Sequence, residues 1–227
     1  MKPLKVGLLG AGGNNVGDAR GLHHARHLSA LDAGTIVAVC DIVASAAERS
    51  AAQLGAAAYT DYEKFLRHGM DLVIIATPDT LHAQQAAQAL EAGVGVVSEV
   101  PAATTVDDAR RLVQAYRKAG GFYMLLENYG YRDENELIRR MVQAGQFGDV
   151  YFGEGEYLHD CRGLNRFPDG SFTWRGRSFS GYVYIWHSLR PLLYILDDRS
   201  RDDHHAGGRS AREHLRHGYH ATRPARS

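Results

Sequence analysis

The stretch Leu4-Lys5-Val6-Gly7-Leu8-Leu9-Gly10-Ala11-Gly12 decides how this chain begins to fold. Its apolar part is short and ends at glycines, which is typical of a buried strand. Gly10 and Gly12 follow directly, at the point where the backbone must turn tightly before a helix. The free N–H groups at the start of such a helix favour an anion. The opening stretch therefore predicts a strand, a glycine turn and a helix that together bind a phosphate.

The same alternation of strands and helices continues through the first half of the chain. Further short apolar runs, rich in aliphatic and β-branched residues, occur at Thr35–Cys40, Leu72–Ala76, Val94–Ser98 and Phe122–Leu126. The segments between them carry apolar residues at helical spacing. Strands buried on both faces and joined by helices imply right-handed crossovers. We therefore predict an α/β fold with a doubly wound parallel sheet of the Rossmann type.

The pattern changes from about Asn128. Leu137–Ala144 predicts one more helix, which a glycine-containing turn closes. Val150–Leu158 then alternates between two faces, as an antiparallel strand would. We expect residues 1–127 to form the dinucleotide-binding domain and residues 128–198 to form a partial α+β substrate domain.

Residues 199–227 form a tail with seven Arg and five His but few large apolar residues. Such a segment buries too little apolar area to offset its ordering, so we expect disorder. Metal or nucleic-acid binding is the alternative, although the adjacent pair His204-His205 has poor chelating geometry. From this composition we expect a truncation or an altered reading frame after about residue 198.

Overall composition narrows the classes of partner. Lys plus Arg and Asp plus Glu number 26 each, which favours neither a nucleic acid nor a membrane as partner. The two cysteines, Cys40 and Cys161, have no metal-ligand spacing, and we expect no metal site. No apolar stretch approaches the roughly 18 residues of a membrane span. We therefore expect a cytoplasmic protein.

The glycine turn departs from the usual fingerprint of dinucleotide-binding folds. The third glycine does not follow three residues after Gly12, and Gly17 or Gly21 matches best, as if residues 13–20 held an insertion. Asp41 follows the second predicted strand, where a carboxylate accepts hydrogen bonds from a ribose diol and repels a 2′-phosphate. This favours NAD over NADP. Asp41 is also suited to the N-terminus of the next helix, and the two roles are compatible.

Several motifs, in this order, resemble the Gfo/Idh/MocA oxidoreductase family over roughly residues 4–198. They are Gly10-Ala11-Gly12, Val37–Asp41, Ala76-Thr77-Pro78, His82, Ala92-Gly93, Glu99-x-Pro101, Asn128 and Phe147–Val150. The resemblance implies that Thr77 and Pro78 line the cofactor and that Glu99 approaches the nicotinamide ribose. A rigid turn at Pro78 and at Pro101 is the structural alternative. The predicted cofactor-binding residues are Gly10, Gly12, Gly13, Gly21, Asp41, Thr77, Pro78, His82, Glu99 and Asn128.

Val100 separates this chain from members of that family that oxidise sugar alcohols, which usually carry a lysine there. Valine has no titratable group and cannot assist proton transfer. The segment Glu99-Val100-Pro101-Ala102-Ala103 is similar to a branch that includes NAD-dependent α-N-acetylgalactosaminidase-like glycoside hydrolases. Such enzymes oxidise a sugar hydroxyl transiently and return the hydride after elimination, which makes them exceptions to the two-carboxylate mechanism.

Further motifs of that branch identify candidate catalytic residues. They are Glu127-Asn128-x-x-Tyr131-Arg132, Gly155-x-Tyr157-x-His159-Asp160 and Gly181-x-x-Tyr184-x-x-His187. The resemblance implies catalytic roles for His187, Tyr157, His159 and Tyr184. We assign His187 as the base at the oxidised hydroxyl and Tyr157 to the neighbouring proton, and packing roles are the alternative. His23, His24 and His27 are expected at the surface or near a phosphate.

Three hypotheses follow. The first is an NAD-linked oxidoreductase that transfers a hydride from a sugar or sugar derivative. The second is a redox-neutral NAD-dependent glycosidase, and the third is a non-catalytic NAD-binding remnant. The expected substrate is a small-molecule carbohydrate. We expect a homo-oligomer only if the sheet of the substrate domain is complete enough to form the interface.

Overall fold

The computed structural model describes residues 3–12, 20–178 and 185–197. The chain divides into two compact units, Met1–Leu126 with His159–Val183, and Glu127–Leu158 with Tyr184–Ser227. The division after residue 126 falls beside the predicted boundary at 127, whereas the segment from His159 groups with the first unit. The predicted tail at 199–227 lies outside the described residues.

The first unit is built on a parallel sheet of six strands in the order β3-β2-β1-β4-β5-β6. All neighbouring pairs run parallel, and the order reverses between β1 and β4. This is the strand order of a Rossmann fold, as predicted. The strands are β1 (Leu4–Leu9), β2 (Gly34–Cys40), β3 (Ala57–Tyr59), β4 (Leu72–Ile75), β5 (Gly95–Ser98) and β6 (Tyr123–Leu125). The short strand β3 was not predicted, and of its three residues two are partly buried and Ala58 is exposed.

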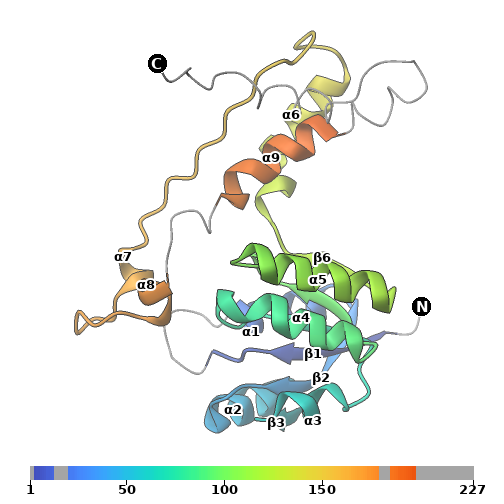
Figure 1. The fold of residues 1–227 in the computed structure, drawn as a ribbon, viewed down its shortest axis with the longest axis vertical. Helices are drawn as coiled ribbons and strands as arrows, with labels where there is room; N and C mark the ends of the chain where they lie inside the picture. The colour runs from blue at the N-terminus through green and yellow to red at the C-terminus, as the bar shows by residue number, and fades with distance from the viewer. Residues whose placement is uncertain (1–2, 13–19, 179–184, 198–227) are drawn as a thin grey trace, which may run out of the picture. The chain divides into compact units, whose positions relative to one another are not determined.

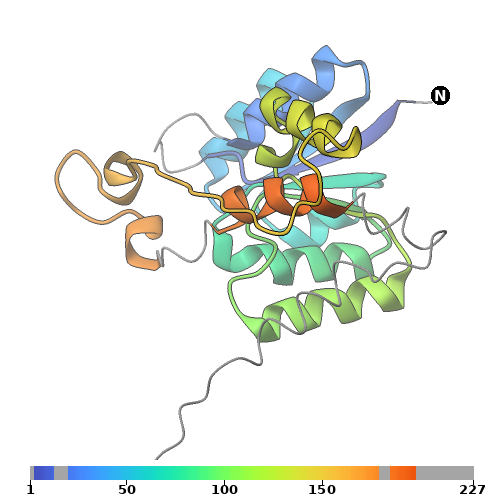
Figure 2. The ribbon, with the colours of Figure 1, turned by 90° about the horizontal axis from the view of Figure 1, so that it is seen from above.

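Helices cover both faces of the sheet, so the fold is doubly wound as predicted. On one face, the core joins strand residues to Ala25 of α1 (Arg20–Ala30) and to Ala46 and Ala51 of α2 (Ala44–Leu54). On the other face, it joins them to buried residues of α4 (His82–Glu91) and α5 (Val106–Ala119). Figure 2 shows α1 and α2, in blue, and α4 and α5, in green, on opposite sides. The remaining helical elements of this unit are α3 (Tyr62–Leu66), η1 (Asp79–Leu81), α7 (Arg162–Asn165) and α8 (Trp174–Ser178).

The second unit contains η2 (Tyr129–Tyr131), α6 (Asp133–Gln143) and α9 (Trp186–Asp197). Helix α6 begins one turn before the predicted helix at 137–144, because Asp133, Glu134 and Glu136 supply the acidic first turn that an N-terminus favours. Helix α9 contacts both η2 and α6.

The predicted antiparallel strand at 150–158 is wrong. These residues form no strand and have no ladder partner among the described residues. Tyr151, Phe152 and Leu158 are 99%, 70% and 89% exposed. Alternation creates two faces but supplies no partner for the backbone N–H and C=O groups, and a strand requires that partner. The segment is drawn as an extended coil (Figure 1).

Candidate functional site

The glycine turn lies at the point where the strand order of the first unit reverses. In open α/β sheets, ligands bind beside the carboxyl ends of the strands at this position. Gly10 has φ +96° and follows β1, and a Cβ there would lie 2.5 Å from the carbonyl oxygen of Ala76, which follows β4. Only glycine therefore permits the two turns to approach so closely.

Gly21 is one of the two glycines predicted for the third position of the fingerprint. It is buried in the first turn of α1, where a Cβ would lie 2.4 Å from Gly10 O and 2.8 Å from Leu8 Cδ1. A missing side chain here permits close packing of the helix on the strand, which is the role of the last glycine in the fingerprint. Gly13 and Gly17 lie outside the described residues.

Asp41 ties the glycine turn to the end of β2. Its Oδ2 accepts the Ala11 N–H at 2.8 Å, and its Oδ1 accepts the Val43 N–H at 2.9 Å, just before α2. Asp41 is 9% exposed. The Val43 contact agrees with the expected position before a helix. Since a carboxylate has about four lone-pair positions, these two bonds leave capacity for a ribose hydroxyl.

His82 joins the turns that follow β4 and β5. Its side chain is 1% exposed, with Nε2 2.8 Å from Thr77 O and Nδ1 2.8 Å from Pro101 O. The Thr77 hydroxyl donates to Gln85 Oε1 at 2.5 Å, and the Val100–Pro101 peptide is cis. The expected cofactor role of His82 remains a prediction. Because both ring nitrogens face backbone carbonyls, such a role would consist of positioning the turns at Thr77 and Pro101.

Glu99 forms a small polar cluster with the start of α1. Its Oε1 lies 2.6 Å from His24 Nε2 and 3.6 Å from Arg20 Nε, and its Oε2 accepts the Val100 N–H at 3.2 Å. Burial acts to raise the pKa of Glu99, but the hydrogen bond and charge of His24, together with Arg20, lower that pKa below its usual range. His24, expected at the surface or near a phosphate, therefore helps to keep Glu99 ionised.

Asp79 and Arg175 form a pair that sequence reasoning missed. Asp79 begins η1 directly after the Thr77-Pro78 turn and is 9% exposed. Its Oδ1 lies 3.8 Å from the Arg175 Nη2 of α8. Burial raises the pKa of Asp79, and Arg175 and His82 oppose that rise. No spacing in the sequence links positions so far apart.

A second cluster lies within the second unit and includes two of the predicted catalytic residues. The His187 ring, in the first turn of α9, is 4.7 Å from the Tyr157 ring and 4.4 Å from the Tyr129 ring, centroid to centroid. Tyr129 and Tyr157 meet edge to face at 5.4 Å. The structure therefore brings His187 and Tyr157 together, thirty residues apart in the sequence.

Glu127 holds His187 in this cluster. Its carboxylate is 4% exposed, and both of its oxygens lie 3.0 Å from His187 Nδ1. Glu127 Oε1 also accepts the Tyr129 N–H at 2.8 Å. A carboxylate beside Nδ1 favours the tautomer with hydrogen on that atom and fixes the orientation of the ring. Sequence reasoning cited Glu127 in a motif but did not assign it a role.

The other predicted site residues have separate places. His159 belongs to the first unit, where its Nδ1 lies 3.5 Å from Cys161 Sγ. Asn128 is exposed, and its carbonyl accepts the Tyr131 N–H at 3.2 Å. Tyr184 lies outside the described residues.

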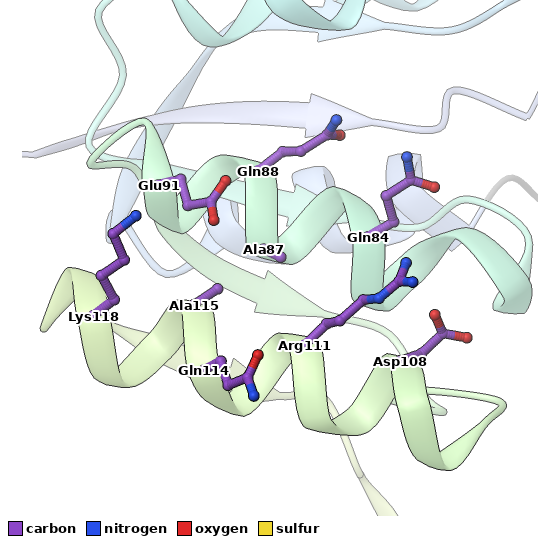
Figure 3. A pocket seen from close by; sticks show the side chains of 9 residues that line it. All are labelled: Gln84, Ala87, Gln88, Glu91, Asp108, Arg111, Gln114, Ala115 and Lys118. Atoms are coloured by element: carbon purple, nitrogen blue, oxygen red, sulfur yellow. The ribbon is translucent and has the colours of Figure 1, made fainter.

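A groove of about 380 Å³ runs between α4 and α5. Its lining consists of three glutamines, two alanines, two acidic and two basic side chains, namely Gln84, Ala87, Gln88, Glu91, Asp108, Arg111, Gln114, Ala115 and Lys118. Figure 3 shows these side chains along the two parallel helices. None of them belongs to the turns at the carboxyl ends of the strands, so the groove is separate from the candidate cofactor site.

Within the described ranges, no three His, Cys, Asp or Glu side chains gather in a way that could hold a metal ion. In the same part of the chain, no helix is both long enough and apolar enough to cross a membrane.

The geometry around β1 and β4 fits a dinucleotide. Gly10 and Gly21 occupy positions where a Cβ would collide with backbone, and Asp41 follows β2. The sequence model of the Gfo/Idh/MocA oxidoreductase family, described as an NAD-binding Rossmann fold, matches residues 4–126, which is over half of the chain. The chain belongs to the Gfo/Idh/MocA family. Its first 126 residues therefore contain the NAD-binding domain of this family.

Relatives of this family member carry the name of a glycoside hydrolase family. A glycosyl hydrolase family 109 protein of Saccharopolyspora erythraea is 33% identical over 86% of this chain and 44% of its own length. A second, from Shewanella pealeana, is 30% identical over 87% of this chain and 45% of its own length. The chain thus spans less than half the length of these relatives.

Solved structures share the fold. The WlbA dehydrogenase of Bordetella pertussis, in complex with NADH and UDP-GlcNAcA, is 28% identical with a TM-score of 0.60, over 66% of this chain and 46% of its own. An NAD-binding protein of Listeria innocua is 29% identical with a TM-score of 0.57, over 66% of this chain and 43% of its own. A myo-inositol 2-dehydrogenase of Lactobacillus plantarum, at 23% identity and a TM-score of 0.59, shows the fold alone.

Proposed function

We propose that this protein binds NAD and transfers a hydride from a carbon that bears a hydroxyl group in a sugar or sugar derivative. The pair of Glu127 and His187, at 3.0 Å, carries the proposal. This chain has Val100 where related dehydrogenases of sugar alcohols have lysine, so the hydroxyl proton needs another acceptor. We assign this role to His187, a residue type suited to general-base work, whose ring Glu127 orients through Nδ1.

NAD, when bound, supplies the hydride acceptor. As the C–H hydride leaves the sugar carbon, the O–H bond breaks and its proton passes to the His187 ring. The carboxylate of Glu127 then faces an imidazolium and stabilises its charge at 3.0 Å. Gly10, Gly21 and Asp41 hold the dinucleotide, and Glu99 contributes a carboxylate at the turn that follows β5.

A redox-neutral NAD-dependent glycosidase is the second candidate function. Two observations favour it: the family 109 relatives and the position of Tyr157 beside His187. After oxidation at one sugar carbon, the hydrogen on the adjacent carbon is acidified, and a tyrosinate can remove it. Elimination of the leaving group, addition of water and return of the hydride restore the oxidation state.

One experiment separates the candidates. The protein is incubated with NAD and either a panel of sugars or an aryl α-N-acetylgalactosaminide. Accumulation of NADH supports the oxidoreductase, whereas NAD-dependent aryl release without net NADH supports the glycosidase. If neither occurs and NAD still raises the melting temperature, the chain is an NAD-binding remnant.

The cellular location is part of the same proposal. Cys40 and Cys161 are free thiols, which agrees with a reducing compartment and supports the predicted cytoplasmic location. A homo-oligomer remains a prediction.

A further inference from the structure

Arg190 lies on the same face of α9 as the proposed base. It follows His187 by three residues, and side chains at this spacing are neighbours on a helix surface. Both side chains contact η2: His187 packs against the Tyr129 ring, and the Arg190 guanidinium lies 5.4 Å from the Tyr131 ring centroid. A group held by Arg190 is therefore within one helical turn of His187.

The structure orients the Arg190 side chain through several contacts. Its aliphatic part packs on buried Gly130, where a Cβ would lie 2.9 Å from Arg190 Cγ. Its Nη2 donates to the Tyr131 hydroxyl at 3.1 Å, and its guanidinium lies 5.3 Å from the Tyr194 ring centroid. Such a side chain loses little further freedom when it binds a ligand.

Among the residues that the structure describes, none supplies a carboxylate partner for the charge of Arg190. Within the described part of the chain, no Asp or Glu oxygen lies within 4.0 Å of its guanidinium nitrogens. Two arginines of α6 differ in this respect, because Arg139 and Arg140 lie 3.6 Å and 2.8 Å from the Glu136 carboxylate. Glu136 also accepts the Tyr194 hydroxyl at 2.8 Å, so its oxygens already have partners.

We propose that Arg190 makes this site selective for anionic sugars, in which a carboxylate or a phosphate group binds the guanidinium. This inference rests on the proposed function, and it adds the class of substrate. A guanidinium presents parallel N–H groups that match two oxygens of a carboxylate or phosphate. Only one N–H is used by the Tyr131 hydroxyl, so others remain for the ligand.

Calorimetric titration of the full chain, saturated with NAD, tests the proposal with three probes. Glucose is the neutral reference, glucuronate carries a carboxylate, and glucose 6-phosphate carries a phosphate. We expect the unaltered protein to bind one of the anionic probes roughly 10- to 100-fold more tightly than glucose, the range typical of hydrogen bonds to charged groups. The two anionic arms distinguish a sugar acid from a sugar phosphate.

Two variants and a control assign the effect to Arg190. Arg190→Met keeps the aliphatic packing on Gly130 and should abolish the preference for the anionic probe. Arg190→Lys keeps the positive charge but not the forked geometry of the guanidinium, and it should retain part of the preference for the anionic probe. If Arg190→Met does not fold, the partial loss in Arg190→Lys tests the proposal in its place. Arg140→Met, which removes an arginine already paired with Glu136, should leave the preference unchanged.

Equal binding of all three probes by the unaltered protein would overturn the proposal. An equal loss of the preference in Arg190→Met and Arg140→Met would also overturn it, because the effect would then be one of net charge. Arg190-dependent binding of an anion without any turnover would instead refute the proposed function and leave the selectivity standing. Turnover of neutral sugars without preferential binding of an anionic probe would refute the selectivity and leave the proposed function standing.

Discussion

The Nδ1 atom of His187 lies 3.0 Å from both carboxylate oxygens of Glu127, although sixty residues separate the two in the sequence. Both side chains are buried, and two tyrosine rings pack against the imidazole. This pair resembles the histidine and carboxylate of many general-base sites, in which the carboxylate fixes the tautomer and does not touch the substrate.

Glu127 is therefore expected to act as a positioning residue. Glu127→Gln should lower kcat by roughly 10- to 100-fold and leave KM within about twofold, since the base is misaligned but present. Steady-state kinetics with NAD and the active sugar measures the two constants. Glu127→Asp, which restores a carboxylate, should recover part of kcat. An unchanged kcat in Glu127→Gln would show that the pair only stabilises the fold.

His187→Ala should remove the base itself. We expect kcat to fall by about 100-fold or more, the range of general-base catalysis. Affinity for NAD, measured by calorimetry, should stay the same, because the contacts of the glycine turn are in the first unit. Full turnover by this variant would contradict the assignment of His187.

Gly21→Ala tests the close packing of α1 on β1. The new methyl group would meet the Gly10 carbonyl at 2.4 Å, so the helix or the turn must shift. We expect a loss of roughly 1–3 kcal/mol in the free energy of unfolding, together with weaker NAD binding. Urea unfolding and calorimetry measure the two effects. Gly163→Ala is the matched control, because nothing lies within 4 Å of its added Cβ.

Asp41→Asn should weaken NAD binding and narrow the preference for NAD over NADP. The amide keeps an acceptor for one of the two backbone N–H groups, but it removes the charge that repels a 2′-phosphate. The ratio of dissociation constants for the two dinucleotides, measured by calorimetry, should shift toward NADP by about tenfold. A ratio that does not change would place the ribose contact elsewhere.

Cys40 should be unreactive in the folded protein. Burial, with the nearby charges of Asp41 and Asp61, raises the pKa of its thiol to about 12. A thiol reagent that needs the thiolate should therefore modify Cys161 and spare Cys40 until urea unfolds the chain. The unfolded state loses the Cys40 proton at lower pH than the folded state. Stability should thus fall as pH rises from about 9 toward 12.

Glu99 has the opposite pH dependence. The pKa of Glu99 is lowered in the folded state, so its contribution to stability is present above its unfolded value near 4.5 and is lost as pH falls through the folded value. In His24→Ala, burial should prevail and raise the pKa of Glu99. The acid-unfolding midpoint, followed by circular dichroism, should then move to higher pH. An unchanged midpoint would mean that Arg20 alone keeps Glu99 ionised.

The amino-acid sequence by itself determined the sheet and predicted the edge of that sheet where a ligand binds. Apolar runs and their spacing are local signals, so they predicted five of the six strands and the doubly wound order. Gly10, Gly12 and Asp41 follow strand ends, and the carboxyl ends of parallel strands meet at one edge. The sequence pattern left two candidates, Gly17 and Gly21, for the third glycine of the fingerprint. It could not choose between them, because the residue at which a helix starts depends on packing.

Only the tertiary structure decided which side chains meet. Glu99 with His24, Asp79 with Arg175 and Glu127 with His187 are pairs between segments far apart in the chain, and no periodicity encodes such a distance. The segment 150–158 failed as a predicted strand for the same reason. The alternation of its side chains can be read from the sequence alone. A β-ladder also needs a second strand beside the first, and the sequence of one segment does not supply it.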